Sequence, residues 1–260
     1  MPVLLNISLV IPVFNEKDNI LKLYLSLEKA LVQLGKRYEI IFVNDGSTDG
    51  GAAIIRKICL SDNAVKHIAF DKNYGQDAAL AAGLRKAGGD IIIAMDADLQ
   101  DDPDDIKVFL DKIREGCDVV CGWRKKRAKR NIVRDVMTFL GNVLGTVIFH
   151  MPVHDFNATF KAYRKSAINE LYFFKGFHRF VPVLATMKNL KIGEVEIRNR
   201  VRNNGYSKYR PFGLKRIFSV SKDAVLLKFA ICFLNRNIEK VLPEVSYVIY
   251  NDPEVGNERK

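Results

Sequence analysis

The first half of the sequence alternates short apolar runs with amphipathic segments, and this alternation restricts the possible folds more than any other feature. Apolar runs predict strands at residues 8–13, 38–43, 65–70, 91–95 and 118–121. Between them, apolar residues spaced three or four apart predict helices at residues 18–34, 52–60, 76–87 and 102–115. Strands that alternate with helices in this way form a parallel sheet with helices on both faces. The sequence therefore predicts an α/β fold with a mostly parallel sheet.

The pattern changes after Gly122. A basic run at residues 124–130 precedes an amphipathic helix predicted over residues 131–149, and a further strand is expected over residues 159–163. An aromatic-rich stretch then leads into a helix near Met187. No internal repeat or low-complexity linker interrupts the sequence, so we expect one domain.

The net charge of +11, from 41 basic and 30 acidic side chains, favours an anionic partner. Phosphate groups, nucleic acid and an acidic membrane face all fit this charge. No apolar run reaches the roughly 20 residues that a membrane-spanning helix needs, and the N-terminus lacks the features of a signal peptide. The four cysteines form no CxxC pair and the four histidines show no zinc-binding spacing, so we expect reduced thiols in a cytosolic setting.

Polar residues follow three of the predicted strands at the point where each strand ends. Asn15 and Glu16 follow the first strand, Asp45 follows the second within a turn-rich segment, and Asp96 and Asp98 follow the fourth. The carboxyl ends of parallel strands share one rim of the sheet, and ligands bind there. We therefore expect these side chains to lie close together.

The acidic pair Asp96 and Asp98 predicts a metal site. In an extended backbone, residues two apart point to the same side, and Gln100 continues the series. Carboxylate and amide oxygens are ligands that Mg²⁺ and Mn²⁺ prefer. The alternative, an acidic start of the next helix, accounts for Asp101 and Asp102 but not for Asp96. The spacing does not match an EF-hand, and the sequence has no P-loop and no GxGxxG motif.

Several short motifs, taken together and in order, carry a resemblance to a known family. They lie at residues 11–16, 43–47, 73–76, 96–100, 160–164, 178–182 and 202–209. This set resembles the inverting family 2 glycosyltransferases, and within them the polyprenyl-phosphate branch that includes the dolichyl-phosphate mannose synthases. The resemblance covers roughly residues 7 to 216. It implies the GT-A fold, with a Rossmann-like, mostly parallel sheet and helices on both faces.

The resemblance also implies roles for individual residues. Expected contacts of the nucleotide-sugar are Pro12, Phe14, Glu16, Val43, Asp45, Asp96, Ala97, Asp98, Arg124, Arg202 and Lys208. Expected ligands of the metal, Mg²⁺ or Mn²⁺, are Asp98, Gln100 and Asp96. Expected catalytic residues are Arg124, Arg202, Lys208 and Asp155, and expected contacts of the acceptor phosphate are Arg134 and Ser207. Asp155 either orients the acceptor or acts as a base, or it ends a turn. Asn44 stands where the family usually has an acid.

The expected reaction is the inverting transfer of one sugar from a nucleotide-sugar, of the GDP-mannose or UDP-glucose type, to dolichyl or undecaprenyl phosphate. The QxxRW motif of processive synthases is absent, which favours transfer of a single sugar. One alternative is a related enzyme with a saccharide or protein acceptor. Another is a non-enzymatic module with the same fold that binds membrane or nucleic acid.

These expectations divide the chain by function. Residues 1–216 would form the catalytic domain, with a nucleotide-sugar half at residues 1–122 and an acceptor half at residues 123–216. Residues 217–260 would form an amphipathic, interfacial segment and a polar tail.

The basic run at residues 124–130 has three interpretations: a solvated loop, a nucleic-acid patch, or contact with anionic lipid headgroups. Contact with lipid fits best because an amphipathic helix follows directly, whereas no aromatic platform accompanies the run. We therefore expect no nucleic-acid partner. We expect a peripheral protein at the cytoplasmic face of a membrane, which binds the lipid surface or docks on a membrane-embedded partner subunit.

Overall fold

The computed structural model describes residues 6–125, 153–155, 158–200 and 247–250. Several predictions fall elsewhere in the chain and lie outside the described residues. They are the helix over residues 131–149, the interfacial segment after residue 216, and the site residues Arg134, Arg202, Ser207 and Lys208.

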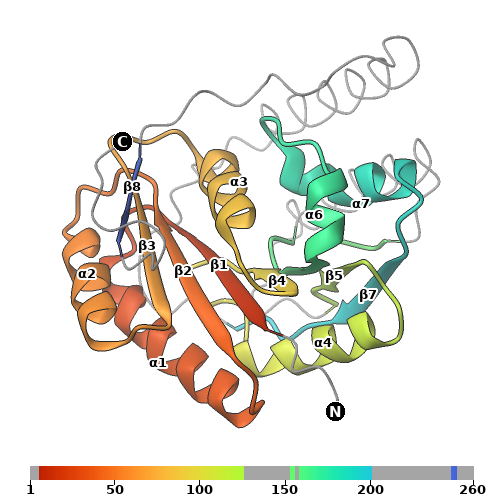
Figure 1. Cartoon of the computed structure of the whole chain (residues 1–260), viewed down its shortest axis with the longest axis horizontal. Helices are drawn as coiled ribbons and strands as arrows, with labels where there is room; N and C mark the ends of the chain where they lie inside the picture. Colours follow the sequence, from red (N-terminus) through yellow and green to blue (C-terminus); the bar gives the residue numbers. More distant parts are fainter. Residues whose placement is uncertain (1–5, 126–152, 156–157, 201–246, 251–260) are drawn as a thin grey trace.

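The described residues form one eight-stranded sheet (Figure 1). Its strands are β1 (Ile7–Val13), β2 (Tyr38–Asn44), β3 (Val65–Phe70), β4 (Ile91–Ala94), β5 (Val119–Trp123), β6 (Lys161–Arg164), β7 (Ile192–Glu196) and β8 (Tyr247–Tyr250). The strand order is β7-β5-β6-β4-β1-β2-β3-β8. The pairs β4–β1, β1–β2, β2–β3 and β5–β7 are parallel, so the predicted mostly parallel sheet is confirmed.

Two strands run against this direction. β6 lies between β4 and β5 and pairs antiparallel with both, and β8 pairs antiparallel with β3 at one edge of the sheet. The sequence pattern predicted β6 as a strand but did not place it between β4 and β5. Hydrophobic periodicity reports which face of a strand is buried and carries no information on strand order.

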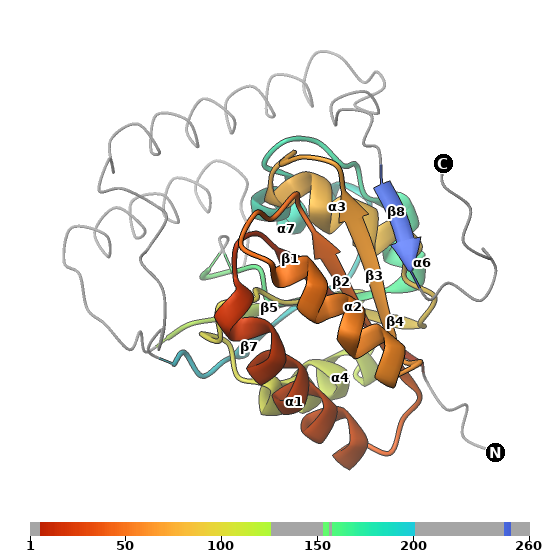
Figure 2. The same ribbon diagram turned by 90° about the vertical axis from the view of Figure 1, so that its left-hand side faces the viewer.

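Helices cover both faces of the sheet, as predicted (Figures 1 and 2). One face carries α1 (Lys17–Gln33), α2 (Gly51–Ser61) and α4 (Ile106–Arg114), which share a hydrophobic cluster with the sheet. The other face carries α3 (Gln76–Lys86), α6 (Lys165–Glu170) and α7 (Phe177–Met187), which pack in a second cluster. In β1, every second residue from Ile7 to Val13 packs in the first cluster and Val10 packs in the second, and β1 is buried along its whole length.

The helix predicted over residues 102–115 begins differently from the prediction. Residues Pro103–Asp105 form a 3₁₀ turn, and α4 starts at Ile106. Pro103 has no amide to donate, and the Asp102 carboxylate accepts a hydrogen bond from the Asp104 amide at 3.2 Å, which caps the turn. The acidic residue Asp102 therefore caps the turn as its sequence position suggested.

The strand directions bring several chain segments to one rim of the sheet. β1, β2, β4 and β5 end there, and β6 begins there because Lys161 pairs with Ala94 and Cys121. β7 also ends at this rim, and β8 begins there, since Tyr247 pairs with Phe70 at the end of β3. Residues 200 and 247, which border an undescribed segment, therefore lie at the same rim near opposite edges of the sheet.

Candidate active site

The acidic pair Asp96 and Asp98 lies directly after β4, at the shared rim. The backbone between them bends, and Leu99 has a φ of 62°, so the extended conformation predicted for this segment is wrong. A left-handed conformation costs about 1–3 kcal/mol for a residue other than glycine and persists only where the surroundings hold it. The two carboxylates nevertheless lie close enough to interact. Burial and the charge of Asp98 raise the pKa of Asp96 to about 6.

The first turn of α3 holds Asp96 in place. The Gln76 side-chain amide donates to Asp96 Oδ1 at 2.8 Å and lies 3.4 Å from Thr159 Oγ1, just before β6. Gly75 directly precedes this helix and has a φ of 97°. Gln76 belongs to a recognised motif but received no role from the sequence. Its contact with Asp96 depends on how α3 packs on the sheet.

Asp45 uses both carboxylate oxygens within the protein. Asp45 Oδ1 accepts from the Tyr74 amide at 2.7 Å, and Oδ2 accepts from the Gly75 amide at 2.9 Å and from Asn73 Nδ2 at 3.0 Å. Burial raises the pKa of Asp45, although the two amides act in the opposite direction. The side chain therefore fixes the loop that leads into α3. Its predicted contact with the nucleotide remains a prediction.

The other residues predicted at the nucleotide divide into two groups. Pro12 and Val43 are buried and pair across β1 and β2. Phe14 and Glu16 follow β1, where Phe14 is 36% exposed and Glu16 accepts a hydrogen bond from Asn19 Nδ2 at 2.6 Å. The Phe14 and Glu16 side chains are thus the more accessible members of this set. Ala97 is buried within the bend after β4.

Asn44 has a structural partner of its own. Its side-chain oxygen accepts from the Ser47 amide at 3.1 Å, and Ser47 Oγ in turn accepts from the Asn15 amide at 2.9 Å. The Asn15 side chain accepts from the Thr48 amide at 2.8 Å. An asparagine at position 44 therefore stabilises the turn after β2, where short polar side chains are favoured.

Arg124 and Asp155 form a buried ion pair beside the acidic pair. Arg124 Nε lies 3.2 Å from Asp155 Oδ2, and both side chains are largely buried. Burial lowers the pKa of Arg124, but the carboxylates of Asp155, Asp101 and Asp96 outweigh burial and raise it. Arg124 therefore keeps its charge, and the structure brings together the predicted residues Asp96, Asp98, Arg124 and Asp155.

Two further buried charges were not predicted at this site. The Lys161 ammonium donates to the Ala158 carbonyl, and burial lowers its pKa although Asp155 and Asp96 lie near. Burial raises the pKa of Asp101 to about 7. Asp101 forms a bridge with Asn199 and is not part of the helix start, which corrects the expectation from sequence. The motif around Lys161 was recognised, but a lysine in a strand is usually exposed, so its position gave no signal.

His178 lies next to the first turn of α3, because it contacts Asp77, the residue after Gln76. His178 Nδ1 lies 2.6 Å from Asp77 Oδ1, and the Gly176 amide donates to Asp77 Oδ2 at 2.8 Å. Burial lowers the pKa of His178, against the effect of Asp77. The pair joins the start of α3 to the start of α7.

In the part of the chain that the structure describes, no three His, Cys, Asp or Glu side chains are grouped so as to hold a metal ion. Among the same residues, no helix combines the length and the apolar character that crossing a bilayer requires.

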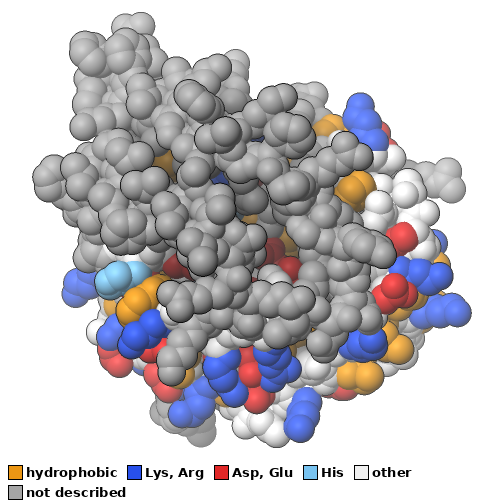
Figure 3. Space-filling model, turned by 180° about the vertical axis from the view of Figure 1, so that it is seen from behind, with side chains coloured by type: hydrophobic (Ala, Val, Ile, Leu, Met, Phe, Trp, Pro, Cys, Tyr) orange, Lys and Arg blue, Asp and Glu red, His pale blue; other side chains and the backbone are white. Residues whose placement is uncertain are grey.

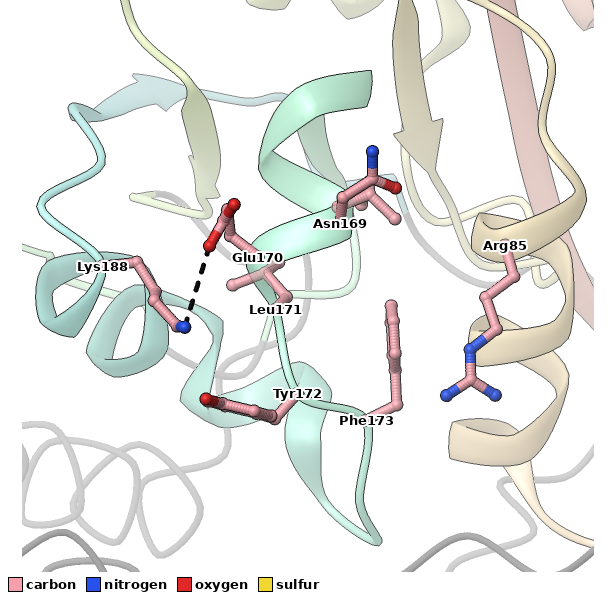
Figure 4. A pocket seen from close by; sticks show the side chains of 8 residues that line it. Arg85, Asn169, Glu170, Leu171, Tyr172, Phe173 and Lys188 are labelled. Atoms are coloured by element: carbon pink, nitrogen blue, oxygen red, sulfur yellow. Dashed lines mark ion pairs between the residues drawn. The ribbon is translucent and has the colours of Figure 1, made fainter. Parts of the chain in front are cut away.

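A separate cavity of about 410 Å³ lies between α3, α6 and the C-terminal end of α7 (Figure 4). Its lining includes Arg85 at the end of α3 and Lys188 just after α7. Arg85 lies over the Phe173 ring at 4.8 Å, and Lys188 lies 3.7 Å from Glu170. This cavity contains none of the predicted site residues.

Comparison with known proteins shows the family of the chain. Residues 8–172 match the glycosyl transferase family 2, and the chain belongs to this family. It is 34% identical over 229 residues to a dodecaprenyl-phosphate galacturonate synthase of Rhizobium johnstonii, with 86% of this chain and 67% of the relative covered. It is 33% identical over 204 residues to an undecaprenyl-phosphate 4-deoxy-4-formamido-L-arabinose transferase of Proteus mirabilis, with 78% and 62% covered. The chain thus spans about two thirds of the length of these relatives.

Solved structures show the same fold. Glucosyl-3-phosphoglycerate synthase from Mycobacterium tuberculosis, in complex with Mn²⁺, UDP-glucose and phosphoglyceric acid, superposes with a TM-score of 0.66. That comparison covers 90% of this chain and 82% of the other, at 19% identity. The predicted GT-A fold is confirmed.

Proposed function

We propose that this protein transfers a single sugar from a nucleotide-sugar to a polyprenyl phosphate, with inversion at the anomeric carbon. The observation that carries the proposal is the acidic pair Asp96 and Asp98 at the rim, with the charged Arg124 beside it. Membership of family 2 and the polyprenyl-phosphate substrates in the names of the relatives support the reaction class.

The donor is a nucleoside-diphosphate sugar. GDP-mannose and UDP-glucose are the two donors predicted from sequence, and the names of the relatives add galacturonate and an arabinose derivative to the sugars worth testing. The acceptors in those names are dodecaprenyl and undecaprenyl phosphate, which favours undecaprenyl over dolichyl phosphate here.

The residues at the rim fit a divalent cation, Mg²⁺ or Mn²⁺. The raised pKa of Asp96 reflects burial next to a second carboxylate, and a cation at this point would relieve the repulsion. Asp98, Gln100 and Asp96 offer the hard oxygen donors such ions take, and Mg²⁺ is usually held by one or two carboxylates together with substrate phosphates. When bound, the ion stabilises the negative charge on the departing diphosphate.

The acceptor phosphate needs cationic partners more than it needs a base. Its second pKa is about 6, so the phosphate is anionic at neutral pH. Arg124 supplies a fixed charge near the acidic pair, and Asp155 holds its guanidinium at 3.2 Å. We therefore propose that Asp155 orients Arg124 and does not act as a base. Arg134, Arg202, Ser207 and Lys208 remain the predicted further contacts of the two anions.

The protein is proposed to act at the cytoplasmic face of a membrane. The net charge of +11 supports attraction to anionic lipids. On the described part of the surface in Figure 3, basic and acidic side chains are interspersed. Docking on a membrane-embedded partner subunit is the other arrangement that the sequence predicts. Flotation with vesicles that contain anionic lipid tests the first arrangement, and binding that is insensitive to salt would speak against it.

The test of the reaction is a panel of nucleotide-sugars with Mn²⁺. A true donor raises the melting temperature by mass action, and release of nucleoside diphosphate should then require undecaprenyl phosphate. The double variant Asp96→Ala, Asp98→Ala should lose turnover. Full turnover in this variant would refute the metal site, and turnover with a soluble saccharide or protein in place of the lipid would favour the alternative acceptor.

A further inference from the structure

The loop that carries the candidate metal ligands is hydrogen-bonded to residues almost one hundred positions further along the chain. The Arg200 amide donates to the Gln100 carbonyl at 2.7 Å, and Asn199 forms a bridge with Asp101. The backbone of Gln100 is therefore tied to the segment that follows β7. A movement of that segment would also move the Gln100 side chain.

Four side chains reinforce this connection. Arg200 Nη2 donates to Asp102 Oδ2 at 2.6 Å, and Arg198 Nη1 lies 3.2 Å from the same oxygen. Asp105 accepts from the Arg198 amide at 2.7 Å and from Arg198 Nε at 2.8 Å. We call Asp102, Asp105, Arg198 and Arg200 the outer clamp.

The burial of the outer clamp is asymmetric. The Asp102 side chain is 3% exposed, whereas the side chains of Arg198 and Arg200 are 57% and 54% exposed. A buried carboxylate without a partner is unfavourable, so Asp102 keeps the arginines in place. The exposed arginines can be replaced without leaving a cavity in the core.

The outer clamp also explains how the strained bend persists. Leu99, with a φ of 62°, lies between the candidate ligands Asp98 and Gln100. Such a conformation needs support from its surroundings. Before the bend, Gln76 fixes Asp96 by a hydrogen bond. After the bend, the outer clamp and the Arg200 amide fix residues 100–105.

We propose that Asp102 and Asp105 are positioning residues, which act through Arg198 and Arg200 to hold Asp98 and Gln100 in the geometry that binds the divalent cation. This inference rests on the proposed function, since it assumes a metal site at the rim. It assigns the clamp a role in metal affinity in addition to any contribution to folding. The acidic residues after Gln100 therefore do more than start a helix.

The test measures Mn²⁺ binding directly, by the loss of the electron paramagnetic resonance signal of free Mn²⁺ during titration of the 260-residue chain with UDP or GDP present. The variants Arg200→Ala and Arg198→Ala remove exposed side chains, and Asp105→Asn keeps the shape of the carboxylate. We expect the half-saturating Mn²⁺ concentration to rise about tenfold in each variant. The conservative variant Asp105→Glu should recover part of the affinity.

The matched control is Asp111→Asn. Asp111 forms an exposed ion pair with Arg114 on α4, at 2.7 Å, and lies outside the clamp. The same change of charge there should leave Mn²⁺ affinity within twofold of the wild type. Thermal unfolding of each variant shows whether the fold is retained.

The outcomes separate the two proposals. If the wild type binds no Mn²⁺ with either nucleotide, the proposed metal-dependent function fails. If the wild type binds Mn²⁺ while the folded variants Arg200→Ala and Arg198→Ala bind it equally well, the outer clamp is only structural and the positioning role is wrong. If Asp111→Asn weakens Mn²⁺ binding as much as Asp105→Asn does, the loss of a negative charge is the cause and the positioning role of Asp105 is wrong.

Discussion

At the scale of single residues, the site is organised by side chains that hold other side chains. Gln76 holds Asp96, Asp155 holds Arg124, and Asp45 holds the loop before α3. None of these contacts is local in sequence, and each involves at least one partner that is buried or partly buried. Substituting the holding residue should therefore change the geometry of the site without unfolding the protein.

Gln76→Leu should reduce kcat/KM by about tenfold, which corresponds to about 1.4 kcal/mol of lost transition-state stabilisation. The reason is that Asp96 loses the donor at 2.8 Å that fixes its carboxylate. Steady-state kinetics with the best donor gives the measurement. Gln33→Leu, the same change at an exposed position near the end of α1, is the control. Equal kinetics in both variants would contradict the role of Gln76.

His67 should make stability depend on pH. His67 is fully buried in β3, and burial, with Arg56 nearby, lowers its pKa from 6.5 to about 4. Below pH 6.5 the unfolded chain binds a proton that the folded chain does not, so stability falls as pH falls toward 4, by up to about 3 kcal/mol. Urea unfolding of the wild type and His67→Gln between pH 7.5 and 4.5 tests this. A stability difference that stays constant with pH would refute it.

At the scale of elements, the position of α3 sets the site, because its first turn carries Gln76 and Asp77. Gly83 lets this helix lie close to the sheet. A Cβ at position 83 would overlap the side chain of Val10 and lie 3.0 Å from Val43 Cγ2. The same helix reaches α7 through the contact of Asp77 with His178 at 2.6 Å.

Gly83→Ala should destabilise the protein by up to about 2 kcal/mol. Alanine raises helix propensity by about 1 kcal/mol, but overpacking against β1 costs about 1–3 kcal/mol and prevails here. Chemical unfolding gives the measurement. Ser26→Ala, on the exposed side of α1, should show only the small gain from propensity. A Gly83→Ala variant as stable as the wild type would show that α3 can move away from the sheet freely.

The sequence predicted the elements of the first half well but not the contacts between distant ones. The apolar runs placed β1 to β4 to within one or two residues, because a central parallel strand is buried on both faces and must be continuously apolar. The bend at Leu99 could not be predicted, since leucine rarely has a positive φ. The outer clamp joins residues far apart in sequence, and no local pattern marks such a partnership.

At the scale of the whole molecule, strand β8 protects an edge of the sheet. It pairs with β3 over residues 247–250, near the C-terminal end of the chain. Without it, the backbone groups of β3 on that side would lose their partners, and unpaired strand edges favour association between molecules.

Deletion of residues 247–260 should lower the melting temperature and increase aggregation, because the edge of β3 becomes available to other chains. Size-exclusion chromatography with light scattering measures the aggregated fraction. Deletion of residues 251–260 alone keeps β8 and serves as the control. Identical behaviour of the two truncated proteins would show that β8 contributes nothing to the protection of this edge.

The placement of β6 restricts how the molecule can move. β6 is hydrogen-bonded to β4 on one side and to β5 on the other. It therefore joins β4 and β5 into one continuous sheet. Separating β4 from β5 in a hinge motion would break the backbone hydrogen bonds of β6, which is a buried strand. Any opening of the candidate site would therefore have to come from the loops at the rim, because the strands beneath them are tied into a fixed platform.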